Sequence, residues 1–186
     1  MSIKPLTSIL FFCFMIHVQL SFGQNMIRWV DPARVSEKVD KGNKMFLLYF
    51  HFNGCKWCKS MEAGAFQDDH TARFINQHFH AVKINALDAE SINLGQQEYE
   101  PVTVGKHDFN GLAVEMLQGR MSFPAIVVLD EKFEKIGVHH SYQSLDEFQK
   151  ILAYYAGRHY RNTLFKHYSS SYCKESHFNS MVSNRQ

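Results

Sequence analysis

The feature that most constrains the fold is a pair of cysteines placed directly after a long apolar segment. Residues 45–52 form an almost unbroken apolar and aromatic run, which Asn53-Gly54 ends. Such a run, bounded by turn residues, predicts a strand buried on both faces of a central sheet. Cys55-Lys56-Trp57-Cys58 follows and begins a predicted helix over 55–66. The two cysteines are therefore expected at the junction of a buried strand and a helix.

That location suits thiol chemistry. The first turn of a helix exposes backbone N–H groups and the positive end of the helix dipole, and both favour a thiolate over a thiol. Lys56 and Lys59 add positive charge nearby. Cys58 lies three residues after Cys55, so the two sulfurs can form a disulfide. We therefore expect Cys55 to be the exposed nucleophile and the more buried Cys58 to resolve the mixed disulfide.

Other interpretations of the motif stay open. A structural zinc site needs four ligands, and the chain has no second CxxC or HxxxH pair; His51 is the candidate third ligand. A covalent haem needs CxxCH, but residue 59 is lysine. A purely structural disulfide would close too small a ring to add much stability.

The rest of the chain alternates between helices and strands. Asp31-Pro32 begins a predicted helix that Gly42 ends, and residues 86–107 form a polar insertion with a short hairpin. Hydrophobic periodicity and turn residues predict further helices over 68–78, 108–118 and 144–156, and strands over 81–85, 125–130 and 133–138. This order predicts an α/β fold, with a mixed central sheet flanked by helices.

Phe123-Pro124 precedes the second strongly apolar strand. Proline is tolerated at the first position of a strand, because it need not donate to the ladder. In a sheet protein that also carries a CxxC, we expect this peptide bond to be cis and to present the backbone of residue 123 beside the disulfide.

The two ends of the chain are expected to differ from its middle. Residues 1–23 combine Lys4, an apolar run and small residues Ser21 and Gly23, the pattern of a cleaved secretory signal peptide, with an uncleaved anchor as the alternative. We assign 24–168 to one domain, with no membrane span in the mature chain, and 169–186 to a mobile tail carrying Cys173.

Charge limits the partners of this protein. The 20 basic and 18 acidic residues give a net charge of +2, without the concentrated basic stripe that binds nucleic acid. Nucleic acid is therefore not an expected partner.

The motif, the order of elements and Pro124 together resemble the thioredoxin fold. The segments GCKWCKSMEAGAFQDDHTARFINQHFHAVKIN and EMLQGRMSFPAIVVLDE resemble secreted thioredoxin-like proteins of the Bacteroidetes type. They are similar, more distantly, to the C-terminal domain of the periplasmic transmembrane disulfide reductase, which supplies electrons toward cytochrome c maturation. The similarity covers residues 27–168.

The resemblance implies a thiol–disulfide oxidoreductase, more a reductase than an oxidase. Its catalytic residues would be Cys55 and Cys58, and its substrate-binding residues Trp57, Phe123 and the cis-proline Pro124. It would act as an exported, periplasmic monomer without a bound cofactor or metal. Its partners would be protein thiols or disulfides and an electron-donating redox protein.

Two departures from thioredoxin concern proton transfer. Thioredoxin has a buried aspartate six residues before its first active-site cysteine, and Tyr49 stands at that position here. Lys83 falls where thioredoxin has a lysine near its site, and His51 stands where it has a tryptophan. Lys83 and His51 are therefore possible modulators of the cysteines, although a packing role for His51 is also consistent with the sequence.

Two other classes of function remain open. One is a metal-binding module that uses Cys55, Cys58 and His51. The other is a non-catalytic thioredoxin-fold interaction protein that binds through the insertion or the tail.

Overall fold

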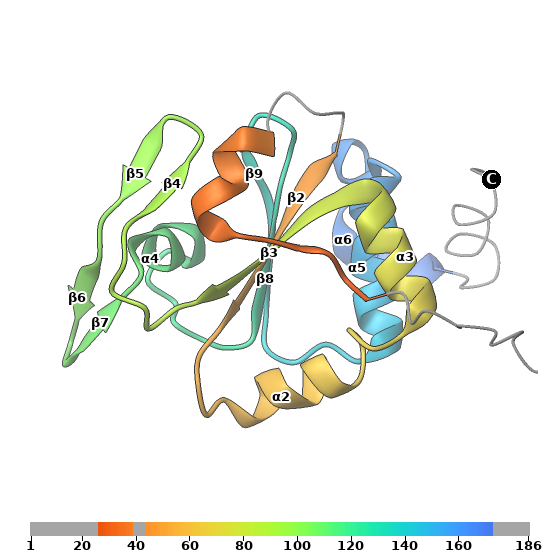
Figure 1. Cartoon of the computed structure of the whole chain (residues 1–186). Coiled ribbons are helices and arrows are strands. Elements are labelled where there is room, and N and C mark those ends of the chain that lie inside the picture. Colours follow the sequence, from red (N-terminus) through yellow and green to blue (C-terminus); the bar gives the residue numbers. More distant parts are fainter. Residues whose placement is uncertain (1–25, 39–43, 173–186) are drawn as a thin grey trace, which may run out of the picture.

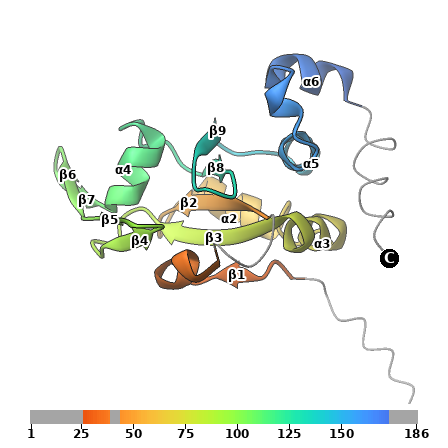
Figure 2. The ribbon, with the colours of Figure 1, turned by 90° about the horizontal axis from the view of Figure 1, so that it is seen from above.

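A five-stranded sheet forms the centre of the molecule. The computed structural model describes residues 26–38 and 44–172. Along the sheet the order is β1-β3-β2-β8-β9, which Figure 2 shows from one edge to the other. The strands are β1 (Trp29–Val30), β2 (Met45–His51), β3 (Phe79–Asn85), β8 (Ala125–Leu129) and β9 (Lys135–His140). Strands β1 and β2 run parallel to β3, whereas β8 and β9 add antiparallel, so the sheet is mixed as predicted.

Strand β2 divides the hydrophobic core in two. Its side chains alternate across the sheet, so Leu47 and Tyr49 enter one cluster while Phe46, Leu48 and Phe50 enter the other. All five are 0–1% exposed. This double burial explains why the strand is a continuous apolar run rather than an alternating one.

Helices cover both faces of the sheet (Figure 1). One cluster contains side chains of α2 (Lys56–Ala63), α3 (Asp69–His78), α5 (Leu145–Ala156) and α6 (Phe165–Ser171). The other contains side chains of the 3-10 helix η1 (Pro32–Lys38) and of α4 (Gly111–Leu117). The structure therefore confirms an α/β architecture with helices on both faces. Among the described residues, no helix has the length and apolar character needed to cross a bilayer.

The predicted helix after Asp31 is a 3-10 helix. The N–H of Arg34 donates to the carbonyl of Asp31, which is the tighter i to i+3 pattern. Val35 is 1% exposed and packs in the core, but Val39 and Gly42, on which the prediction also relied, lie outside the described residues.

The insertion contains two hairpins rather than one. Strands β4 (Ile92–Leu94) and β5 (Gln97–Tyr99) form the first, and β6 (Val102–Val104) and β7 (His107–Phe109) form the second. Gly95 and Gly105 adopt φ of 65° and 66° in their turns, a left-handed conformation that favours glycine. Because β7 uses residues 107–109, α4 begins at Gly111 and not at 108.

In the β8–β9 hairpin the second strand begins two residues later than predicted, so β9 spans 135–140. The Asp130 side chain accepts hydrogen bonds from the N–H groups of Lys132 and Glu134, which extends the turn. Phe133 within this turn has φ of 66°. Strand geometry therefore resumes only at Lys135.

The segment after α5 packs as an additional layer. The short 3-10 helix η2 (His159–Arg161) leads into α6, whose Tyr168 is 6% exposed. Leu164, the residue before α6, is 63% exposed. The assigned domain boundary at 168 falls inside α6. Residues 173–186, including Cys173, lie outside the described residues.

Candidate active site

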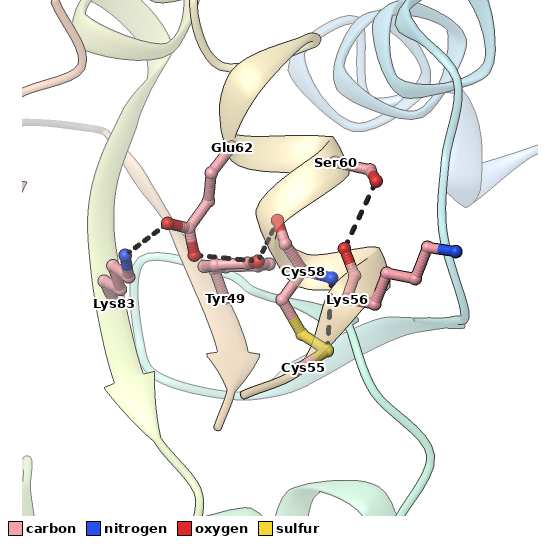
Figure 3. The surroundings of a disulfide bond; sticks show 7 residues. All are labelled: Tyr49, Cys55, Lys56, Cys58, Ser60, Glu62 and Lys83. Atoms are coloured by element: carbon pink, nitrogen blue, oxygen red, sulfur yellow. Dashed lines mark hydrogen bonds and ion pairs between the residues drawn. A yellow bond between two sulfur atoms is a disulfide. The ribbon is translucent and has the colours of Figure 1, made fainter. Parts of the chain in front are cut away.

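Cys55 and Cys58 form a disulfide at the start of α2 (Figure 3). Their Cα atoms are 5.3 Å apart. Cys55 is the N-cap of the helix, and its Sγ accepts a hydrogen bond of 3.1 Å from the N–H of Cys58. The N–H of Cys55 donates to the carbonyl of Phe52 at 3.2 Å, which closes the turn after β2. The cysteine sulfur thus occupies the capping position that a serine or aspartate oxygen commonly takes.

Both cysteines are buried, although Cys55 was expected to be exposed. Cys55 is 5% exposed and Cys58 is 1% exposed, so the predicted order is correct but Cys55 is not an open side chain. The bond to Cys58 and the N–H of the first helical turn hold its sulfur against the protein. Any group that reacts with Cys55 therefore has to come close to this turn.

A polar network lies directly behind the disulfide. The buried Tyr49 hydroxyl directs its proton toward two acceptors, the Cys58 carbonyl at 3.3 Å and Glu62 Oε1 at 3.2 Å. Glu62 Oε2 in turn pairs with Lys83 Nζ at 2.9 Å. Burial, with the negative charge of Glu62 adding to it, raises the pKa of Tyr49 well above its usual range. Figure 3 shows these groups on the inner side of α2.

Glu62 is the site residue that sequence reasoning missed. The missing aspartate at position 49 was noted, but not that α2 supplies a carboxylate one turn after Cys58. The sequence offered one local signal, because Glu62 is four residues after Cys58 on the same helix. The pairing of Tyr49 with Lys83 across the parallel strands became visible only in the structure. Lys83 was expected near the site, and the structure places it against Glu62.

His51 packs beside this network at the end of β2. Its ring stacks on Tyr49 with centroids 5.7 Å apart and an interplanar angle of 12°. Burial, and after it the charge of Lys83, lowers the pKa of His51, so the ring is neutral at pH 7. No group of three or more histidine, cysteine, aspartate or glutamate side chains suited to a metal occurs in residues 26–38 and 44–172.

The other three predicted site residues are Trp57, Phe123 and Pro124. The Phe123-Pro124 peptide bond is cis, as expected, and the Phe123 ring meets the Phe52 ring edge-to-face at 5.6 Å. On α2, Trp57 is 56% exposed and its ring lies 5.6 Å from that of Tyr142. Two aromatic pairs therefore include a residue close to the cysteines in the chain. Phe52 pairs with Phe123 of the cis-proline loop, and Trp57 of α2 pairs with Tyr142.

A family model described as a thioredoxin-like domain matches residues 34–156. The chain belongs to the thioredoxin-like domain family. The match spans β2, the cysteine pair, the cis-proline and α5, so it includes every element that builds the site.

Solved structures support the thioredoxin-like fold. A thioredoxin-fold protein from Helicobacter pylori aligns with a TM-score of 0.54 at 19% identity, covering 75% of this chain and 94% of that one. A thioredoxin from Thermus thermophilus aligns with a TM-score of 0.50 at 18% identity, covering 68% and 84%.

One curated relative is similar over a short region. An uncharacterised protein of Caenorhabditis elegans is 30% identical over 67 residues, which is 36% of this thioredoxin-like chain. The chain spans 9% of the length of that relative.

Proposed function

We propose that this protein is an exported thiol–disulfide oxidoreductase in which Cys55 attacks and Cys58 resolves. The observation that carries the proposal is the position of Cys55 as N-cap, with its Sγ accepting the Cys58 N–H. A hydrogen-bond donor and the helix dipole both stabilise negative charge on that sulfur. Cys58 lies one turn away and is almost fully buried. It can therefore bond to Cys55 but is shielded from molecules in solution.

The reaction transfers two electrons between dithiol and disulfide. The Cys55 thiolate attacks one sulfur of a substrate disulfide, forms a mixed disulfide and expels the other substrate sulfur as a thiolate. Cys58 loses its proton and attacks Cys55 Sγ, which releases the second substrate thiolate. The Cys55–Cys58 disulfide remains, and the substrate has gained two electrons and takes up two protons. No bound cofactor is needed for either step.

The aromatic side chains and the cis-proline would hold the substrate. Pro124 has no backbone N–H to donate. An extended substrate segment would therefore form its backbone hydrogen bonds with Phe123. Trp57 supplies an exposed aromatic surface on the other side of the motif. We assign substrate binding to Trp57, Phe123 and Pro124.

We propose the reductive direction, with electrons supplied by another redox protein. The support is the sequence similarity to the C-terminal domain of the periplasmic disulfide reductase, and the same similarity suggests a link to cytochrome c maturation. A reduction potential near that of thioredoxin, about −270 mV, would agree with a reductase. A potential near −120 mV would contradict it.

Export is proposed from residues 1–23, which have the pattern of a signal peptide. The mature protein would then act as a monomer in the periplasm. Mass spectrometry of the protein recovered from its native cells should give an N-terminus near Gln24. Recovery of intact Met1 in the cytoplasmic fraction would contradict export.

The decisive experiment is trapping with Cys58→Ser. Without the resolving thiol, Cys55 should remain joined to its partners, and these complexes should disappear on reduction. The matched control is Cys55→Ser, which keeps one cysteine of the pair and should trap nothing. Insulin reduction should fall to the uncatalysed rate in both variants. If Cys58→Ser forms no complexes and insulin reduction is unchanged, the protein is not a dithiol catalyst.

A further inference from the structure

The insertion builds one wall of an apolar groove that also contains Phe52, three residues before Cys55. A cavity of about 270 Å³ is lined by the side chains Phe52, Leu87, His107, Phe109, Met121 and Phe123. We call it the hairpin groove, because His107 and Phe109 belong to strand β7. Five of its six lining residues are apolar, and none is an acid, a lysine or an arginine.

Two residues that line the hairpin groove also connect to the active site. The carbonyl of Phe52 accepts the N–H of Cys55, and Phe123 precedes the cis-proline. The rings of Phe52 and Phe123 pack edge-to-face at 5.6 Å and so join the turn before the cysteines to the cis-proline loop. A substrate segment that reaches Cys55 along Phe123 therefore passes the groove.

The β6–β7 hairpin turns an apolar face to the same side. Val102 pairs with Phe109, and Val104 pairs with His107, so these four side chains share one face of the ribbon. On the opposite face, Thr103 Oγ1 donates to Asp108 at 2.7 Å. Val102 and Val104 are 41% and 37% exposed. The face that contains groove residues thus continues outward as exposed apolar surface.

The base of the insertion is fastened to the domain, so this wall has a defined place. Asn110 is 1% exposed; its N–H donates to the Ala86 carbonyl and its side-chain amide donates to the Glu90 carbonyl, both at 2.9 Å. Gly111 lies so close to the Glu100 carbonyl that a Cβ would come within 1.9 Å of the oxygen. Figure 1 shows both hairpins extending from the α4 side of the sheet.

We propose that the hairpin groove selects substrates by holding a bulky apolar side chain that neighbours the target cysteine. The occupant is an extended segment of the substrate polypeptide, and the inference rests on the proposed oxidoreductase function. Leu87, which is 40% exposed within the groove, and the apolar face of β6–β7 are its specificity-determining surfaces. Burying one such side chain favours a substrate by about tenfold or more.

The test compares two peptides that differ in one residue. Each carries a single cysteine joined to thionitrobenzoate, preceded by phenylalanine in one peptide and by serine in the other. Reduced full-length protein attacks the peptide sulfur and expels thionitrobenzoate, the better leaving group, whose colour reports the rate. The symmetric disulfide of thionitrobenzoate, which has no peptide, measures Cys55 alone, and Cys55→Ser supplies the background rate.

The phenylalanine peptide should react at least about tenfold faster than the serine peptide. Leu87→Asn should remove most of this preference and leave the rate with the peptide-free disulfide unchanged. Val104→Thr, which keeps the shape and strand preference of valine, should reduce the preference partly. Leu164→Asn is the matched control: it changes an exposed leucine beside α6, and the preference should persist.

Three outcomes would overturn the inference. Equal rates for the two peptides, with an intact peptide-free reaction, would leave the oxidoreductase function in place and remove the groove as a selector. Equal effects of Leu87→Asn and Leu164→Asn would do the same. A dimer in sedimentation that Leu87→Asn dissociates would assign the groove to a second copy of the chain. Absence of any reaction that depends on Cys55 would instead contradict the proposed function itself.

Discussion

Two residues, Tyr49 and Glu62, replace the single buried aspartate of thioredoxin. Tyr49 stands at its position in the sequence, and Glu62 supplies the carboxylate. A tyrosine on β2 fills the space behind Cys58, and the carboxylate comes from α2 at about one-third exposure, paired with Lys83. This arrangement keeps the negative charge in partial contact with water, which reduces its desolvation cost. We expect a charge placed there to act on the thiols of the reduced protein.

At this scale we predict opposite effects of Glu62→Gln and Lys83→Met. Removing the carboxylate favours the Cys55 thiolate, so the midpoint of alkylation by iodoacetamide should move to lower pH, by about half a pH unit. Removing the lysine should move it to higher pH by a similar amount. The measurement uses reduced mature protein carrying Cys173→Ser. Lys132→Met is the control, because Lys132 follows the end of β8 that pairs with the start of β2, away from the cysteines. Shifts of the same sign in both variants would disprove an electrostatic role.

Sequence reasoning at the residue scale succeeded where the chemistry is local. The cysteine pair and the cis bond at Phe123-Pro124 depend on a motif and one neighbouring proline, and both were identified. Glu62 was not identified, because its partners come from two separate strands and only the fold brings them together. The roles assigned to Trp57, Phe123 and Pro124 in substrate binding stay predictions.

The helix caps connect elements as well as ending them. Asp68 caps α3 by accepting hydrogen bonds from the N–H of Thr71 at 2.8 Å and from its hydroxyl at 2.7 Å. It also accepts one from the side chain of Gln149, a residue of α5 that is only 2% exposed. Ser144, by contrast, caps α5 through a local capping box with Glu147.

This difference predicts unequal costs for two similar substitutions. Asp68→Ala should lower the free energy of unfolding by about 2 kcal/mol, since it leaves buried donors on Thr71 and Gln149 less satisfied. Ser144→Ala should lower it by about 1 kcal/mol, the usual cost of losing an exposed cap. Urea unfolding followed by circular dichroism measures both. Equal losses would show that the link between α3 and α5 contributes nothing.

Long helices and strands with clear end signals were predicted more accurately than short ones. Strand β2 has a long apolar run, and helices α3 and α5 have long periodic patterns with strong N-caps. The predictions for all three are confirmed. The three-residue strands of the insertion carry too few side chains to show a period, so one hairpin was expected where there are two.

The layer added by α6 encloses a histidine of the sheet. His139 Nε2 lies 3.0 Å from the Tyr155 hydroxyl, and its ring meets that of Phe165 edge-to-face at 4.8 Å. Burial, with the charge of His140 adding to it, lowers the pKa of His139 to about 4. An unfolded histidine has a pKa of about 6.5, so the unfolded chain binds a proton that the folded protein excludes.

Stability of the whole molecule should therefore fall as the pH decreases from about 6.5 toward 4. Because the folded pKa is the lower one, protons favour the unfolded chain over this window, and the loss from His139 alone should reach about 2 kcal/mol at pH 5. His139→Gln keeps a neutral polar group near Tyr155 without the titration, so its unfolding free energy should vary less with pH. Urea unfolding at pH 7.5 and pH 5 compares them, and identical differences would contradict the assignment.

The two hairpins of the insertion pair only within themselves, whereas every ladder of the central sheet except the β8–β9 hairpin joins residues far apart in the chain. Substitutions at exposed positions of the hairpins therefore should leave the long-range pairings intact, and loop length itself carries only a modest entropic cost. The exposed face of the insertion can therefore be redesigned without altering the scaffold that carries the sulfurs.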